Sequence, residues 1–352
     1  MSTFASKEYD ASSYAAFRPV YNQNLYDLIA LYASKRGAGT TALDLGCGTG
    51  QVTRALLKMY DKVIGVDPSP SMIQQAKLES AEWDEHDRVT FIVGTAEDIC
   101  SYLGEHSVDL VTAGQSAHWF DQSKIWNALE HVVKSGGVVA FWVECYHPNT
   151  KSPPNVVMRL TPQPLIQGYG SFRITGRPDL TSMLRNFASN ENGLGPFWQQ
   201  PGVSILDAKY RTIQFPNNDA WLASSSTRVF LEGPSEDGTT LPYRSFDDAL
   251  QSGLLTEPEW RTDTIIDRSL TWNNMTAYFR TWSAVHSYQQ QYPIDKEKTG
   301  RGAEGDIVDR FIESLRQALQ EPSDEVDVYW PVFLMMGKRA SLVGSPEKMQ
   351  LE

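Results

Sequence analysis

The sequence predicts an α/β fold with a largely parallel sheet of seven strands and a lid or insertion lobe in the C-terminal half of the chain. Between residues 41 and 146, short apolar segments alternate with amphipathic segments of helical length, the pattern of a parallel sheet whose crossovers are helices. Eight of the nineteen prolines then lie between Pro148 and Pro201, which disfavours long regular elements because proline lacks a backbone N–H. Regular patterning returns near residue 263.

Five strands and three helices are predicted in the first half. Each strand is a short apolar run bounded by turn residues, and the five runs are 41–46, 62–67, 88–94, 108–114 and 137–144. Helices are expected at 51–60, 69–83 and 122–134, because apolar side chains recur there at spacings of three and four. Ile125, Leu129 and Val132 show this spacing. These helices are expected to cover the sheet.

The second half is expected to be less regular. A helix is predicted near 180–189, and the stretch 217–261, which contains GPSEDGTT, is expected to be irregular and solvated. Order resumes with a strand at 264–272, helices at 274–288 and 306–319, and a closing strand at 326–337. These two late strands would complete the sheet of seven.

Five regions follow from this pattern. We expect an N-terminal helical cap, a ligand-binding core, a lid or insertion that forms the substrate region, C-terminal helices with the closing strands of the same sheet, and a short solvated tail. Their boundaries are 1–40, 41–146, 147–262, 263–340 and 341–352.

Charge and cysteine content narrow the classes of function. The formal net charge is −12, which disfavours nucleic acid and anionic membranes as partners. Cys47, Cys100 and Cys145 are too few and too far apart for a disulfide framework or a CxxC site. The six histidines show no HxH or HExxH pairing, so no metal is expected. No leader and no apolar run of roughly 18 residues is recognisable, so a cytoplasmic location is expected.

The segment LDLGCGTG holds most of the information about the ligand. It places Asp44 at the end of a predicted strand and Gly46, Gly48 and Gly50 in the turn into the next helix. Residues without Cβ let a ligand approach the backbone N–H groups at a helix N-terminus, so a nucleotide-like ligand is predicted. The dinucleotide pattern GxGxxG needs a glycine where Gln51 stands, which disfavours NAD and FAD.

Asp67 ends the second predicted strand in VIGVDPS, where a carboxylate can accept hydrogen bonds from both hydroxyls of a ribose. Together with LDLGCGTG, the GTAED segment and the SGG turn before VVAFWV, this makes the chain resemble a class I S-adenosylmethionine-dependent methyltransferase. Blocks along the whole chain resemble the fungal trans-aconitate methyltransferases and the related cantharidin-detoxifying methyltransferase. They are YxxFRPVY (14–21), AHWFD (117–121), FWQQPG (197–202), RTWSAVHSY (280–288), DIVDRFIESL and FLMMGKR.

The resemblance implies a Rossmann-like, seven-stranded class I methyltransferase fold and a role in fungal metabolism. It also implies S-adenosylmethionine as methyl donor, S-adenosylhomocysteine as product, and no metal. Residues of the glycine turn would hold the amino-acid part of the donor, namely Asp44, Gly46, Cys47, Gly48 and Gly50, with Gln115 beneath it and Arg18 near its carboxylate. Asp67 would bind the ribose.

The adenine site is implied by the same resemblance. Pro68 and Met72 would flank the ring, with Ala96 and Glu97 near its amino edge. Where members of this superfamily often show GDA, this chain has Gly94, Thr95 and Ala96. The usual acidic contact to the adenine amine is therefore missing, and Glu97 is the expected substitute.

Candidates on the acceptor side are aromatic residues and histidines. The catalytic candidates are His118, Trp119 and His286, and the substrate-binding candidates are Tyr14, Trp198 and Trp282. His118 and Trp119 follow the fourth strand, whose C-terminal end faces the ligand crevice of a doubly wound sheet; the alternative is an aromatic cluster that caps the strand. Trp282 and His286 lie four apart on one predicted helix and share a face, either toward substrate or in the core. The C-terminal tryptophans form either an aromatic-walled pocket or a core.

Methyl transfer from a sulfonium is an in-line displacement to which an enzyme contributes mainly by positioning. A carboxylate with a pKa of about 4 needs no base, whereas a hydroxyl or a protonated amine must lose a proton. No buried acid–base pair is evident. This absence, together with the resemblance to the trans-aconitate methyltransferases, makes a carboxylate oxygen that becomes a methyl ester the first prediction. The alternatives are an oxygen, nitrogen or carbon of an aromatic or terpenoid metabolite, and, in another class, a non-catalytic regulator that binds S-adenosylmethionine.

An anionic acceptor would require an arginine in the substrate region. The available ones are Arg173, Arg177, Arg211, Arg228 and Arg280. The acceptor is expected to be a small molecule. A monomer is expected because no coiled-coil heptad run appears, with a homodimer as the alternative.

Overall fold

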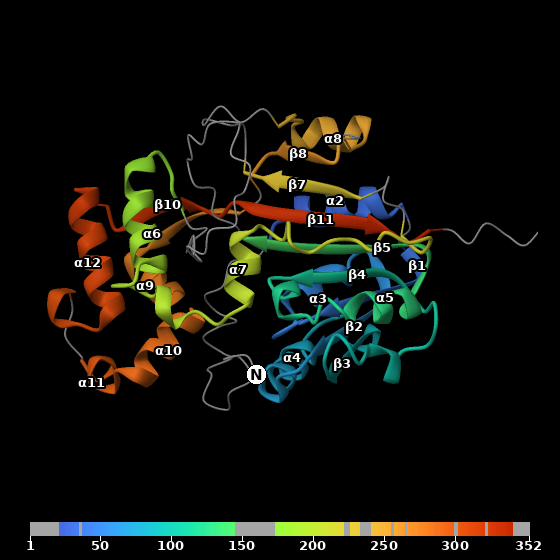
Figure 1. Ribbon diagram of the computed structural model, residues 1–352, viewed down its shortest axis with the longest axis horizontal. Coiled ribbons are helices and arrows are strands. Elements are labelled where there is room, and N and C mark those ends of the chain that lie inside the picture. The colour runs from blue at the N-terminus through green and yellow to red at the C-terminus, as the bar shows by residue number, and fades with distance from the viewer. Residues whose placement is uncertain are drawn as a thin grey trace, which may run out of the picture.

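The computed structural model contains two lobes side by side (Figure 1). It describes residues 21–34, 37–144, 173–221, 226–232, 241–254, 257–264, 266–298, 302–320 and 323–340. The larger lobe is built on one long sheet, and the smaller lobe holds a short sheet with helices around it.

The large sheet has eight strands in the order β3-β2-β1-β4-β5-β11-β7-β8. The first five in this order are parallel, β11 is antiparallel to both of its neighbours, and β7 and β8 are parallel to each other. In chain order the strands are β1 (Gly37–Leu45), β2 (Tyr60–Asp67), β3 (Val89–Val93), β4 (Val108–Gly114), β5 (Val133–Glu144), β7 (Thr227–Leu231), β8 (Glu259–Thr262) and β11 (Val332–Lys338).

Both faces of this sheet are buried, as a parallel sheet with helical crossovers requires. Consecutive strand residues point to opposite faces: Ala42 and Ala140 belong to one apolar core, Leu43 and Phe141 to the other. The first core includes, among others, residues of α2 (Gln23–Ala33), α3 (Gln51–Leu56) and α4 (Pro70–Ser80). The second includes residues of α5 (Ile125–Val132) and α7 (Gly202–Asp207). Another helix, α8 (Phe246–Ser252), lies beside β8 and α2.

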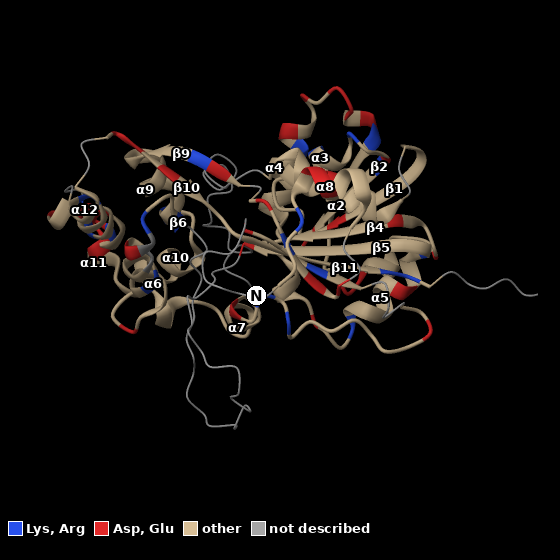
Figure 2. Ribbon diagram, turned by 90° about the horizontal axis from the view of Figure 1, so that it is seen from above, with Lys and Arg blue, Asp and Glu red and all other residues tan. Residues whose placement is uncertain are grey.

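The smaller lobe has a three-stranded antiparallel sheet in the order β6-β10-β9. Its strands are β6 (Arg173–Ile174), β9 (Asp267–Thr271) and β10 (Glu325–Tyr329). Its helices are α6 (Thr181–Ser189), α9 (Trp272–Arg280), α10 (Ser283–Gln291), α11 (Pro293–Lys296) and α12 (Ile307–Leu319). Seen from above, the charged residues lie mostly on the helices and loops of both lobes rather than along the long strands (Figure 2).

The α/β fold with its large parallel-dominated sheet is confirmed, but the number and origin of the late strands differ from the prediction. The predicted strand 264–272 forms β9 in the small sheet. The predicted strand 326–337 is divided into β10 and β11, and only β11 joins the large sheet. The division falls at Pro331, which has no N–H, next to Trp330, whose N–H donates to Ile266 O.

Two further expectations were wrong in detail. The stretch 217–261 contains β7 and β8, four to five residues each, in which Arg228 and Glu259 interrupt the apolar pattern. The helix predicted over 274–288 is two helices, α9 and α10. The first ends where the Thr281 hydroxyl donates to Tyr278 O, because such a bond to the preceding turn competes with continuation of the helix. By contrast, the helix near 180–189 is confirmed as α6.

An aromatic cluster forms the core of the smaller lobe. The Phe187 and Phe311 rings stack with centroids 3.9 Å apart and planes 3° from parallel. The Trp282 ring lies edge-on to Phe279 at 4.8 Å and tilted against Trp198 at 5.6 Å. This places three helices, α6, α9 and α12, around one apolar centre.

Phe311→Ala is therefore expected to lower the free energy of unfolding by about 3–5 kcal/mol, the range for removing a buried aromatic ring. Phe311→Leu keeps most of the volume and should cost less than about 1.5 kcal/mol. Denaturant midpoints followed by near-UV circular dichroism measure both variants. A loss under about 1 kcal/mol for the Ala variant would show that the small lobe does not depend on this stack.

Candidate ligand-binding site

The glycine turn after β1 begins the site. Gly46, Gly48 and Gly50 have φ of +66°, +55° and +92°, values that glycine adopts without the strain a side chain would bring. A Cβ on Gly46 would lie 2.4 Å from the Cβ of Ser116, so the turn lies directly against the loop that follows β4. A Cβ on Gly48 would meet no atom within 4 Å, so this side of the turn is open to a ligand.

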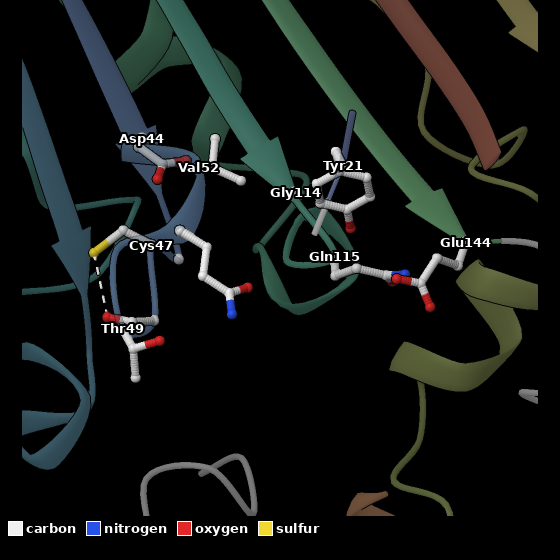
Figure 3. A pocket seen from close by; sticks show the side chains of 11 residues that line it. Tyr21, Asp44, Cys47, Thr49, Val52, Gly114, Gln115 and Glu144 are labelled. Carbon is white, nitrogen blue, oxygen red and sulfur yellow. Dashed lines mark hydrogen bonds between the residues drawn. The ribbon is translucent and has the colours of Figure 1, made fainter. Parts of the chain in front are cut away.

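A pocket opens at this turn, at the carboxyl ends of β1, β4 and β5 (Figure 3). This edge of a doubly wound sheet is where ligands bind. The lining residues are Tyr21, Asp44, Gly46, Cys47, Gly48, Thr49, Gln51, Val52, Gly114, Gln115 and Glu144. Five of the predicted donor-binding residues are therefore brought together, namely Asp44, Gly46, Cys47, Gly48 and Gln115.

Asp44 is a buried carboxyl beneath the turn, 1% exposed. Its Oδ2 accepts a hydrogen bond from the Thr53 hydroxyl at 2.7 Å, and its Oδ1 accepts one from the Thr112 hydroxyl at 3.0 Å. Burial raises the pKa of Asp44 to about 7, because desolvation disfavours the charged form more than the two hydroxyls favour it. Near neutral pH this side chain is thus divided between its acid and its carboxylate.

Asp67 connects the turn to the end of β2. Its Oδ2 accepts from the Gly48 N–H at 3.0 Å and its Oδ1 from the Ser69 N–H at 2.8 Å. Burial raises the pKa of this carboxyl as well. Each oxygen retains a further lone pair, so Asp67 can position the turn and still accept from a ribose hydroxyl.

Two buried polar atoms in the pocket have no hydrogen-bond partner among the described residues. They are the Thr49 hydroxyl oxygen and Gln115 Oε1. Gln115 also has a φ of +57°, and its N–H donates to Trp142 O at 2.9 Å. Buried polar atoms are nearly always paired, and left unpaired they cost about 1–3 kcal/mol, so these two indicate where a polar ligand would bind.

The predicted adenine residues are not among the residues that line this pocket. Met72 and Ala96 are buried, at 2% and 7% exposure, and Pro68 follows Asp67 directly. Glu97 Oε1 accepts from the Asp121 N–H at 2.6 Å, so this carboxylate already has a structural partner. Gly50 caps the N-terminus of α3. Arg18 and Tyr14 lie outside the described residues.

His118 and Trp119 occupy a short turn after β4 that packs against α7. His118 is 2% exposed, and its Nδ1 lies 3.2 Å from the Tyr210 hydroxyl. A Cβ on Gly202 of α7 would lie 3.1 Å from the His118 ring and 3.2 Å from the Trp119 ring. Burial lowers the pKa of His118 to about 3, so the imidazole is neutral at physiological pH.

The other acceptor-side candidates lie in the smaller lobe. Trp282 is 2% exposed within the aromatic core, and Trp198 Nε1 donates to Ala188 O at 2.7 Å. His286 Nε2 lies 3.1 Å from Gln290 Nε2 on the same helix. The geometry favours the core interpretation for the two tryptophans; contact of these three side chains with a substrate stays a prediction.

The arginines considered for an anionic acceptor already have partners, and none lines the pocket. Three form ion pairs, Arg177 with Asp179 at 2.8 Å, Arg211 with Glu259 at 3.0 Å, and Arg280 with Asp306 and Asp309 at 3.0 and 2.9 Å. Arg173 donates to the Tyr329 hydroxyl and Arg228 to Ile213 O.

Within the described ranges, no His, Cys, Asp and Glu residues gather in a way that could hold a metal ion. None of the helices described is both long and apolar enough to cross a membrane.

The sequence reasoning missed four residues of the lining that bear polar groups. One is Gln51, which was considered only as the departure from the dinucleotide pattern. Thr49 lies inside the glycine motif, so its position was available from the pattern. Glu144 is the last residue of β5, an end that meets the same edge of the sheet as the motif. Tyr21 belongs to the YxxFRPVY block, but nothing in the sequence indicated that this residue lines the pocket.

The glycine turn and the buried Asp44 lie at a pocket at the carboxyl ends of parallel strands. This arrangement defines a doubly wound α/β ligand-binding domain. Residues 43–141 of the chain match the family model described as a methyltransferase domain. A Dictyostelium discoideum protein, provisionally named a methyltransferase, is 23% identical over 332 residues, which are 94% of this chain and 93% of that protein. The trans-aconitate 2-methyltransferase of Enterobacter sp. (strain 638) is 35% identical over 120 residues, 33% of this chain and 43% of that relative.

A solved structure supports the same fold over nearly the whole chain. It is described provisionally as a type II methyltransferase from Anaeromyxobacter dehalogenans, with a TM-score of 0.57, 23% identity, and coverage of 92% of this chain and 99% of that one. The likeness shows a shared fold. The similarity to a methyltransferase domain covers residues 43–141, and the shared fold extends beyond this segment.

Asp44→Asn is expected to change how stability depends on pH. The folded chain keeps the Asp44 proton up to a pKa of about 7, whereas an unfolded chain loses it near pH 4. This group therefore stabilises the fold fully below pH 4, and its contribution is lost as the pH rises toward 7, on the order of 4 kcal/mol in total.

Denaturant midpoints between pH 4 and 8 measure this effect. The Asn variant should lack that decline, whereas Asp247→Asn, at an exposed position of α8, should retain it. Identical pH dependence in the wild type and the Asp44 variant would contradict the high pKa.

Proposed function

We propose that the chain transfers a methyl group from S-adenosylmethionine to a small-molecule acceptor. The observation that carries this proposal is the pocket at the carboxyl ends of β1 and β4, in which the glycine turn is open at Gly48 and the buried Thr49 hydroxyl and Gln115 Oε1 have no partner among the described residues. Nine of its eleven lining residues belong to the segment 43–141 that matches the methyltransferase domain, and Tyr21 and Glu144 lie outside that segment.

The residues of the pocket fit the amino-acid end of such a donor. Thr49 can donate to a carboxylate, and Gln115 Oε1 can accept from an ammonium group. Gly46 and Gly48 bring backbone close to the ligand, and Asp67 has lone pairs left for the ribose. S-adenosylmethionine would supply an activated methyl group on a sulfonium and leave as S-adenosylhomocysteine. The chain's own task is to hold acceptor and methyl in line.

The acceptor proposed first is a carboxylate oxygen, and the product a methyl ester. A carboxylate is ionised at neutral pH and needs no base, which suits a pocket whose described lining contains no histidine. The relative from Enterobacter named trans-aconitate 2-methyltransferase supports an acid as acceptor. Membership of the fungal branch of these enzymes stays a proposal, which rests on the sequence blocks along the chain.

A second candidate is a hydroxyl, amine or carbon acceptor of an aromatic or terpenoid metabolite. The observation that favours it is the carboxyl group of Glu144 in the lining, because a carboxylate can take the proton that such an acceptor must lose. We also propose a monomer that acts on small molecules in the cytoplasm without a metal. The net charge of −12 supports a small-molecule partner over nucleic acid.

Mass spectrometry of reactions with labelled S-adenosylmethionine and a panel of tricarboxylic acids, aromatic acids, phenols and amines tests the proposal. A labelled methyl ester on an acid is expected, and fragmentation locates the methyl group. Gly48→Val places a side chain in the open part of the turn and should abolish both binding and product. Product at a phenol or amine would select the second candidate. Donor binding without product from any panel member or from a metabolite extract would overturn the transferase and indicate a regulator.

His118→Gln separates a catalytic from a structural role of this histidine. Because burial holds the pKa of His118 at about 3, we expect the pH profile of kcat from pH 6 to 9 to keep its shape in the variant. The absolute rate should fall no more than about tenfold through altered packing against Tyr210 and α7. Loss of an ionisation from the profile would instead identify His118 as the base.

A further inference from the structure

Gln115 has an unfavourable backbone conformation at the carboxyl end of β4. Its φ is +57°, in the left-handed region, where the Cβ of an L-residue crowds the backbone. Its side chain lines the pocket, and its buried Oε1 has no hydrogen-bond partner among the described residues (Figure 3). Strained residues of this kind persist only where the surrounding structure fixes them, and they gather at functional sites.

Hydrogen bonds to both neighbours of β4 fix the chain at Gln115. The Gln115 N–H donates to Trp142 O of β5 at 2.9 Å. The hydroxyl of the next residue, Ser116, donates to Leu45 O at 2.7 Å, and Leu45 is the last residue of β1. Because β4 lies between β1 and β5 in the sheet, the strained residue is held from both sides.

The Ser116 hydroxyl extends the connection between β4 and β1 beyond their paired residues. The pairing of the two strands runs from Ala42 with Leu110 to Asp44 with Thr112, so Ser116 lies past its end. Ser116 is 6% exposed. Its side chain lies against the glycine turn, as the contact with Gly46 described above shows. A buried hydroxyl with one described acceptor, at the point where the chain turns toward the pocket, is suited to fix that turn.

We propose that Ser116 is a positioning residue that holds Gln115 in its left-handed conformation and thereby keeps Oε1 in the donor pocket. This inference rests on the proposed function and deepens it. Without the bond to Leu45 O, the residue after Gln115 is no longer fixed to β1, so Gln115 can relax to a negative φ that turns its side chain away from the ligand. Ser116 is not among the lining residues, and it acts through Gln115.

A double-mutant cycle tests this role without any turnover. The variants are Ser116→Ala, Gln115→Ala and the double variant, and isothermal titration measures their affinity for S-adenosylhomocysteine, which has the amino-acid part of the donor and no methyl group to transfer. Gln115→Ala should weaken binding about tenfold, because the amide oxygen that accepts from the ammonium group is lost. Ser116→Ala should weaken binding about fivefold when Gln115 is present. In the Gln115→Ala background it should weaken binding less than about twofold, because the positioned group is already absent.

Denaturant unfolding separates this effect from a general loss of stability. Ser116→Ala should lower the denaturant midpoint equally in both backgrounds, because the bond to Leu45 O does not involve the Gln115 amide. Ser80→Ala is the matched control. It removes another buried serine hydroxyl, which donates to Lys77 O at 3.2 Å at the end of α4, and it should lower the midpoint without changing the affinity. Ser116→Cys, with a weaker donor of similar shape, is the test variant if Ser116→Ala does not fold.

The outcomes that would overturn the inference are distinct. Equal weakening by Ser116→Ala in both backgrounds would show that Ser116 acts without Gln115. Unchanged affinity in Ser116→Ala would show that the hydroxyl does not position the site. A loss of affinity in Ser80→Ala as large as in Ser116→Ala would attribute the effect to stability alone. If the wild-type chain binds neither S-adenosylhomocysteine nor S-adenosylmethionine, the proposed function fails, and this inference fails with it.

Discussion

The approach of the glycine turn to the end of β4 is the constraint on which the site depends. The Cα of Gly46 lies so close to Ser116 that an added Cβ would be 2.4 Å from the Cβ of that residue. On the other side, the Gly48 N–H is bound by the carboxylate of Asp67 at the end of β2. The turn is thus fixed between its two neighbouring strands, and its free side is left open. Any rotation of β4 relative to β1 would close this space or remove the contact.

The buried polar groups follow from this geometry. A carboxyl at the end of β1 has to lie beneath the turn, where two hydroxyls bind it and where desolvation raises its pKa to about 7. Thr49 and Gln115 face the open side, where no described residue pairs with their buried oxygens. Since an unpaired buried polar atom costs about 1–3 kcal/mol, the site gives up stability that a bound polar ligand restores. Preorganisation for a ligand accounts for both the buried carboxyl beneath the turn and the unpaired oxygens of Thr49 and Gln115.

An element of the fold or a residue of the site could be predicted from the sequence where a local residue pattern determines its structure. The five parallel strands and the glycine turn could be predicted because apolar runs and residues without Cβ leave a strong local signal. The fate of the last strands could not, because Pro331 and the bond from Trp330 to Ile266 divide one apolar run between two sheets. Trp282 could not be placed in core or pocket, because its neighbours Phe187 and Trp198 are distant in the sequence. Glu144 was missed because a single acid at a strand end has no motif.

The charges around the pocket connect donor and acceptor chemistry. The described lining has no cation, and the candidate arginines are engaged by carboxylates, a phenol or a carbonyl. Under the proposed function, the sulfonium of a bound donor would be a positive charge that attracts an anionic acceptor. Because burial lowers the pKa of His118 to about 3, its imidazole is a weak base, and we do not expect it to take a proton from an acceptor. Under the proposed function, the contribution left to the described residues of the pocket is to position the reacting atoms.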